Sequence, residues 1–180
     1  ILMHALIKKF RLKSVLEIGF GRGYSAFCMA KTMCDEGIDG KITTVDPVFD
    51  QNFLQQLTRV LPGEWFKKIN FIQATSSDFY SNNSDLSFDF VYIDGDHRYE
   101  HVKKDWLYAK RKQPKFVLFD DYHLPTKNEK DIEVSRLVDE INEYEKELVL
   151  MDRRIFFDDR GISDEELNYG QVLISMDSLK

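Results

Sequence analysis

The sequence has few of the features that mark secreted, membrane-spanning or disulfide-bonded proteins. It contains only two cysteines, Cys28 and Cys34, which have neither CxxC spacing nor a histidine nearby. No apolar run approaches the ~20 residues of a membrane span, and the N-terminus lacks the charged-then-apolar order of a secretory signal. We therefore expect a cytoplasmic protein with unpaired thiols and no membrane partner.

Basic residues are in the minority, with 25 Lys and Arg against 31 Asp and Glu, a formal net charge of -6 and a pI near 5.3. A nucleic-acid-binding surface normally needs clustered Lys and Arg, so we expect no nucleic-acid partner. The hydrophobic fraction of 43% in 180 residues suits one globular domain with a sizeable core. We expect a single domain over residues 1–180, truncated at its N-terminus because it begins at Ile1.

Helical and strand patterns alternate along most of the chain. Strand-like runs at 14–18, 41–45, 69–73, 88–93 and 116–119 are separated by stretches with apolar residues at helical spacing, the last of which spans 132–144. Residues 148–150, 154–157 and 171–174 then resemble strands with no helices between them, so they should pair antiparallel. The pattern predicts an α/β fold, Rossmann-like and doubly wound, with a mostly parallel seven-stranded sheet and an antiparallel C-terminal edge.

Unusual polar residues follow each predicted strand at its carboxyl end, where open parallel sheets bind ligands. In chain order these are Glu17 with Gly19, Gly21 and Gly23, then Asp46, then Thr75 and Ser76, then Asp94 to His97, then Asp120 and Asp121. Because the carboxyl ends of parallel strands meet at one edge, we expect these residues to converge on a single site.

The glycine loop is compatible with two classes of nucleotide-type cofactor. A dinucleotide loop reads G-x-G-x-x-G, but here the third glycine comes one place early, at Gly23, and Tyr24 takes its position. Glu17 also suits a cationic amino group better than a pyrophosphate, which it would repel. Both details favour S-adenosylmethionine, with Asp46 placed to accept hydrogen bonds from ribose hydroxyls.

Four strings carry a family resemblance: E-I-G-F-G-R-G-Y-S-A, V-D-P, Y-I-D-G-D-H and F-D-D-Y. They resemble class I S-adenosylmethionine-dependent methyltransferases, and within them the metal-dependent O-methyltransferases of the catechol, caffeoyl-coenzyme A and macrolide-sugar types. The resemblance covers residues 14–123. The cofactor-binding residues that it implies are Glu17, Gly19, Gly21, Gly23, Tyr24, Ser25, Asp46, Thr75, Ser76 and Asp94.

The resemblance also implies a metal site and a general base. Carried over by position, Asp94, Asp120 and Asp121 bind Mg²⁺ or Mn²⁺, and His97 is the base, so that His97 and Asp94 are the catalytic residues. The residue chemistry agrees, because three carboxylates would repel one another without a cation, and oxygen ligands suit these metals better than Zn²⁺. His123, next to the acidic pair, is a second candidate base.

The expected reaction is methyl transfer from S-adenosylmethionine to a hydroxyl of a small molecule or glycan. Two alternatives stay open: a metal-free methyltransferase acting on nitrogen or on a macromolecule, and a non-catalytic cofactor-binding module. An NAD-dependent oxidoreductase is disfavoured by Gly23 and Tyr24. Catechol-type enzymes carry extra helices before the first strand, where this chain has only residues 1–13. The acceptor and the oligomeric state, a homo-oligomer included, are left open.

Overall fold

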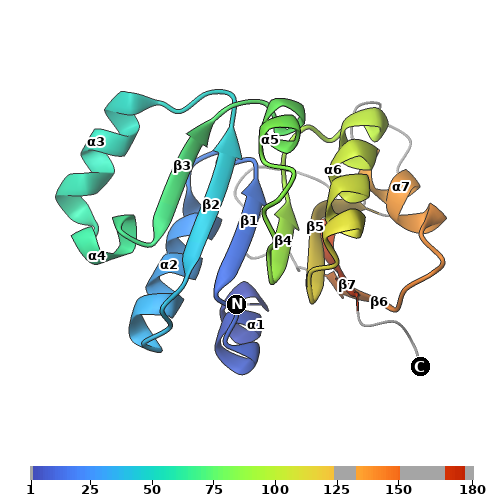
Figure 1. Ribbon diagram of the computed structural model, residues 1–180, viewed down its shortest axis with the longest axis horizontal. Helices are drawn as coiled ribbons and strands as arrows, with labels where there is room; N and C mark the ends of the chain where they lie inside the picture. Colours follow the sequence, from blue (N-terminus) through green and yellow to red (C-terminus); the bar gives the residue numbers. More distant parts are fainter. Residues whose placement is uncertain (1, 124–132, 151–168, 177–180) are drawn as a thin grey trace, which may run out of the picture.

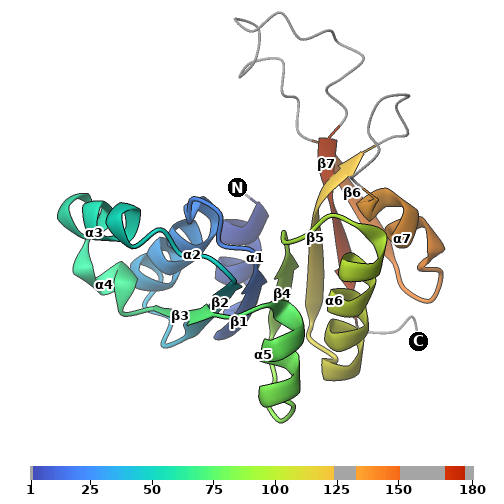
Figure 2. The same ribbon diagram turned by 90° about the horizontal axis from the view of Figure 1, so that it is seen from above.

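The computed structural model describes residues 2–123, 133–150 and 169–176, which form a seven-stranded sheet with helices on both faces (Figures 1 and 2). The strands are β1 (Ser14–Ile18), β2 (Lys41–Asp46), β3 (Ile69–Gln73), β4 (Phe90–Ile93), β5 (Phe116–His123), β6 (Lys146–Leu150) and β7 (Tyr169–Ser175). The helices are α1 (Leu2–Phe10), α2 (Tyr24–Asp35), α3 (Gln51–Val60), α4 (Gly63–Phe66), α5 (Ser76–Asn82), α6 (Tyr99–Lys112) and α7 (Val134–Glu140).

The strand order is β3-β2-β1-β4-β5-β7-β6. Strands β1 to β5 pair in parallel, whereas β7 pairs antiparallel with both β5 and β6. The predicted doubly wound fold, mostly parallel with antiparallel pairing at its C-terminal side, is therefore confirmed. The predicted strand at 154–157 lies outside the described residues.

The core consists of two apolar layers, one on each face of the sheet. Alternate residues of β1 show this, because Val15 packs with α1 and α2 while Leu16 packs with α6 and α7. Both layers are fully buried, as expected for parallel strands covered by helices on both sides. Among the described residues, no helix is both long and apolar enough to cross a bilayer.

Three elements differ from the sequence-based expectation. Strand β5 does not end before the acidic pair but continues to His123, with an irregularity in its pairing between Phe119 and Tyr122, and Asp121 has a φ of 51°. Helix α7 ends at Glu140 because the backbone of Ile141 is extended. The side chain of Ile141 is buried, but the residue is not part of the helix. The short helix α4 follows Pro62 and was not predicted.

The carboxyl ends of β1, β2 and β4 are held together at the glycine loop. Gly19 donates its N–H to the carbonyl of Val45 at 2.9 Å, and Asp94 donates to the carbonyl of Ile18 at 2.9 Å. Gly19 has a φ of 91°, and a Cβ atom there would lie 1.9 Å from the carbonyl oxygen of Asp94. Only glycine fits this position, because any side chain would collide with the backbone of β4.

We expect Gly19→Ala to destabilise the protein much more than Gly21→Ala. Gly21 also has a positive φ of 52°, but a Cβ there would meet nothing within 4 Å. The control should therefore lose only the ~1–2 kcal/mol of a left-handed backbone, while Gly19→Ala should lose at least ~3 kcal/mol because overpacking is added to that backbone cost. Urea unfolding followed by circular dichroism measures both, and equal losses would contradict this account of Gly19.

Candidate active site

Glu17 is a fully buried acid near the carboxyl end of β1. Its carboxylate accepts hydrogen bonds from the hydroxyl of Ser25 in α2 and from Oγ1 of Thr44 in β2, the second at 2.5 Å. Burial raises the pKa of Glu17 from 4.5 to about 7, although the two hydroxyl groups oppose this rise. Glu17 and Ser25, predicted to bind a cofactor, therefore bind each other at the start of α2, and their cofactor role stays a prediction.

Asp46, at the end of β2, binds the backbone of the glycine loop with its carboxylate. Its Oδ2 accepts from the N–H groups of Phe20 at 2.9 Å and Gly21 at 3.4 Å, and its Oδ1 accepts from Val48 at 2.9 Å. Tyr24 stands next to this loop with 83% of its surface exposed. The half-buried Asp46 thus holds the loop backbone, and a further role toward a ribose stays a prediction.

Thr75 and Ser76 lie at the end of β3, beside Asp46. The N–H of Ala74 donates to the carbonyl of Asp46 at 3.1 Å, which joins the ends of the two strands. The hydroxyl of Thr75 accepts from the N–H of Asp78 at 3.1 Å and caps α5. The structure therefore brings both residues to the predicted edge, although the Thr75 hydroxyl serves the helix there.

Asp94, His97 and Asp121 converge at the ends of β4 and β5. Nε2 of His97 lies 3.7 Å from Oδ1 of Asp94 and 3.4 Å from Oδ2 of Asp121. One donor atom from each of the three residues lies within 4.8 Å of the other two. Nε2 is buried and has no hydrogen-bond partner among the described residues. The two carboxylates form a donor pair that fits a divalent cation, with the imidazole nitrogen of His97 beside them.

The pKa values of Asp94 and His97 are both raised. Burial raises the pKa of Asp94, and the carboxylates of Asp120 and Asp121 raise it further. Asp94 raises the pKa of His97, against the opposing effect of partial burial. Nearby carboxylates therefore contribute to the raised pKa of both groups, and a bound cation would offset their repulsion.

Asp120 borders this cluster, and its carboxylate has partners of its own. The hydroxyl of the buried Tyr92 lies 2.5 Å from Oδ2 of Asp120 and 3.1 Å from Oδ2 of Asp94, and Nε2 of Gln171 donates to Oδ1 of Asp120 at 3.2 Å. Of the three predicted metal ligands, the structure therefore groups Asp94 and Asp121 with His97, while Asp120 is bound by Tyr92 and Gln171.

Sequence reasoning missed Thr44, Tyr92 and Gln171. Tyr92 comes two residues before Asp94, so strand alternation places both on the same face of β4. Thr44 alternates with the apolar Ile42 on one face of β2, and Gln171 directly precedes an apolar run in β7, which was the available signal for a buried hydrogen-bond partner. The candidate base His123 lies at the end of β5, but its side chain is outside the described part of the structure.

A family profile with the description "Methyltransferase domain" matches residues 16–122 of the chain. The matched segment contains the glycine loop, Asp46 and the whole Asp94–His97–Asp121 cluster. The expected resemblance to class I methyltransferases is thereby confirmed. A search of curated protein sequences gives no match.

Solved structures share the fold at low sequence identity. The O-methyltransferase TomG from Streptomyces achromogenes, in complex with SAM, matches with a TM-score of 0.68 and 14% identity over 97% of this chain and 77% of TomG. An O-methyltransferase from Bacillus cereus, in complex with SAH, has a TM-score of 0.64 and 13% identity over 99% and 79% of the two chains. A protein from Clostridium thermocellum described as a candidate rRNA methylase has a TM-score of 0.64 and 15% identity over 99% and 94%.

We expect the buried Glu17 to make the stability of the cofactor-free protein fall as pH rises. Its folded pKa of about 7 lies above the ordinary value of 4.5, so the native state binds a proton more tightly than the unfolded state. The stabilisation is complete below pH 4.5 and is lost as pH rises to about 7, a decrease of ~3 kcal/mol at 1.36 kcal/mol per pKa unit. Urea unfolding at pH 5 and pH 8 measures this change.

Glu17→Gln is the matched variant for this measurement, because its amide keeps the size of the carboxyl but does not titrate. The variant should lose less stability than the parent over the same pH interval. Identical pH profiles for the two proteins would contradict the assigned pKa of Glu17.

Proposed function

The chain belongs to the methyltransferase-domain family, and from that premise we propose that it is an S-adenosylmethionine-dependent O-methyltransferase assisted by Mg²⁺ or Mn²⁺. Its acceptor is a hydroxyl group of a small molecule or sugar. The observation that carries this proposal is the meeting of the glycine loop with Asp94, His97 and Asp121 at one edge of the sheet. A methyl donor in the loop would lie beside a base and a cation-binding cluster.

The glycine loop supports cofactor binding in three ways. Its backbone is tight, and Asp46 holds its N–H groups in place. The side chain of Tyr24, directly after the loop, is exposed and accessible to a ligand. Two proteins of the same fold were solved with SAM or SAH, which supports the same cofactor here.

The carboxylates of Asp94 and Asp121 fit a divalent cation and would hold it beside His97. A bound cation supplies Lewis acidity, which lowers the pKa of a hydroxyl group close to it. Asp120 supports the cluster indirectly. It precedes Asp121 in the chain, and its carboxylate is fixed by hydrogen bonds from Tyr92 and Gln171. Carboxylate oxygens favour Mg²⁺ or Mn²⁺ as that cation.

His97 is the proposed general base. Its Nε2 has no hydrogen-bond partner among the described residues, and in the neutral imidazole it can accept the proton of the acceptor hydroxyl. Bound S-adenosylmethionine would supply the methyl group: its methyl carbon would bond to the acceptor oxygen, and both electrons of the broken carbon–sulfur bond would stay on sulfur in neutral S-adenosylhomocysteine.

A macromolecular acceptor is the second candidate, since the candidate rRNA methylase shares this fold and is matched over 94% of its length. The formal net charge of -6 favours the small-molecule acceptor, because it opposes binding to a polyanion. Assays with hydroxylated small molecules and with RNA, each using labelled S-adenosylmethionine, distinguish the two.

We expect His97→Ala to lower kcat by ~10²–10⁴-fold, the usual contribution of a general base. Cofactor affinity and divalent-metal affinity should stay within about threefold of the parent, because a base contacts the acceptor rather than either ligand. The measurements are single-turnover methyl transfer and calorimetry. His101→Ala, in the first turns of α6, is the matched control. Loss of metal binding in His97→Ala would make His97 a metal ligand and contradict its role as base.

We expect Asp121→Asn to weaken Mn²⁺ binding by at least about tenfold, since a charged ligand contributes more than ~1.4 kcal/mol. Asp96→Asn is the control, because Asp96 is a nearby carboxylate that binds Arg98 outside the cluster. Calorimetric titration with Mn²⁺ compares them. Equal Mn²⁺ affinity in both variants, or full methyl transfer in the presence of EDTA, would overturn the proposed metal site.

A further inference from the structure

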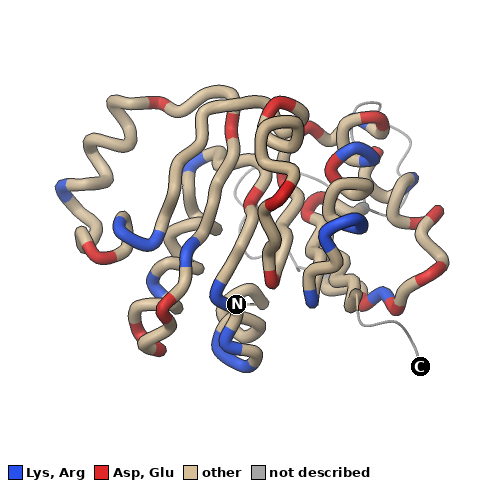
Figure 3. The backbone as a smooth tube through the Cα atoms, viewed as in Figure 1, with Lys and Arg blue, Asp and Glu red and all other residues tan. Residues whose placement is uncertain are grey.

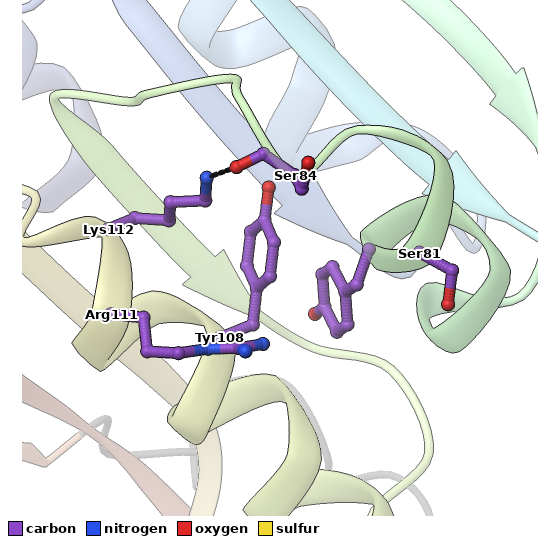
Figure 4. A pocket seen from close by; sticks show the side chains of 6 residues that line it. Ser81, Ser84, Tyr108, Arg111 and Lys112 are labelled. Carbon is purple, nitrogen blue, oxygen red and sulfur yellow. Dashed lines mark hydrogen bonds between the residues drawn. The ribbon is translucent and has the colours of Figure 1, made fainter.

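Helices α5 and α6 form the walls of a groove outside the candidate active site. Two adjoining cavities of about 430 and 630 Å³ occupy it and share Tyr80, Ser81 and Arg111. The α5 side contributes Ser77, Tyr80, Ser81 and Ser84, and α6 contributes Lys104, Leu107, Tyr108, Lys110, Arg111 and Lys112. Figure 4 shows the smaller cavity, with Arg111 and Lys112 opposite Ser81 and Ser84.

The basic end of the groove lies far from the methyl-transfer edge, whereas Ser77, at its other end, directly follows Ser76. Helix α6 begins at Tyr99, two residues after His97. It runs away from that edge for 14 residues and ends at Lys112. At 1.5 Å per residue the last turn of α6 is ~20 Å from its start. The basic end of the groove therefore belongs to a surface that the proposed methyl transfer does not use.

The lining of both cavities is strongly basic. It contains Lys104, Lys110, Arg111 and Lys112 but no carboxylate, in a chain whose net charge is -6 (Figure 3 draws Lys and Arg in blue). Lys110 is paired with Glu143 at 2.8 Å. Arg111 and Lys104 are exposed and have no hydrogen-bond partner among the described residues, so their charges are available to an anion.

The donor groups at the α6 end suit a phosphate. Arg111 offers five N–H donors in a planar fork that matches a phosphate in two parallel hydrogen bonds. Lys112 is held above the Tyr108 ring, 5.4 Å from its centroid, and donates to the carbonyl of Ser84. Its ammonium group has three N–H donors, so donors remain for a ligand.

The wall behind these cations is rigid and partly apolar. Tyr80 and Tyr108 are stacked at 3.9 Å with an interplanar angle of 14°, and the Tyr80 hydroxyl donates to the buried Asp105 at 2.8 Å. Leu107 is 48% exposed in the adjoining cavity. A ligand with both an anionic group and an apolar body would contact the cations at one end and Leu107 at the other.

We propose that the α5–α6 groove binds a small organic phosphate ester at a site separate from methyl transfer. The phosphate group binds Arg111 and Lys112, and the organic part lies against Tyr80 and Leu107. Lys104, two helical turns from Arg111 on the same face of α6, adds attraction for the anion.

The test is a titration of the full chain with phenyl phosphate, without cofactor or divalent metal, monitored by backbone amide shifts. We expect saturable shifts in residues 81–84 and 108–112, with weaker binding of inorganic phosphate, which lacks the organic part. Arg111→Gln should weaken phenyl phosphate binding by at least about tenfold. Arg59→Gln is the matched control, an exposed arginine in the last turn of another helix, and should bind like the parent.

Two outcomes would overturn the proposal. Equal affinity of Arg111→Gln and Arg59→Gln for phenyl phosphate, or no saturable binding to the parent, would show that the groove is not a phosphate site. Tighter binding of a single-stranded RNA 12-mer, also lost in Arg111→Gln, would assign the groove to nucleic acid instead. Calorimetric binding of S-adenosylmethionine by Arg111→Gln tests the proposed methyltransferase separately, so failure of one proposal is distinguishable from failure of the other.

Discussion

The site depends on the close approach of two backbone segments at the centre of the sheet. Gly19, after β1, lies against the carbonyl of Asp94, after β4, with no space for a Cβ atom between them. The chain continues from β1 to β2 on one side of this contact and from β4 to β5 on the other. In a doubly wound sheet the ligand-binding crevice opens at such a point. The glycine loop and the Asp94–His97–Asp121 cluster are neighbours only because this contact is so short.

A row of polar groups crosses the α2-facing side of the sheet below this contact. Thr44, Glu17 and Tyr92 are direct neighbours in the register of β2, β1 and β4. Glu17 accepts a hydrogen bond from Ser25 in α2, and the hydroxyl of Tyr92 donates to Asp120. Buried polar groups are tolerated when they are fully hydrogen-bonded, and they then restrict packing to one arrangement. This row therefore runs from the glycine-loop side of the edge to its acidic side.

Local patterns account for what the sequence predicted well. Alternation of β-rich and helical stretches gave the doubly wound fold, and polar residues at the strand ends gave the convergence of Asp94, His97 and Asp121. The orientation of Asp120 could not be predicted, because it depends on Tyr92 and on Gln171, which is far away in the sequence. Pairing of β7 with β5, and the irregularity that reorients Asp121, are likewise long-range features with no local signal.

The position of β7 has a consequence for the order in which the protein is assembled. β7 is the last described strand in the chain, yet it lies between β5 and β6 and supplies Gln171 to Asp120. During synthesis on a ribosome, β1 to β5 can pair as they emerge, because each needs only strands made before it. β6 must wait for β7 before it joins the sheet. The hydrogen bond of Gln171 to Asp120 can thus form only after every other described strand has been made.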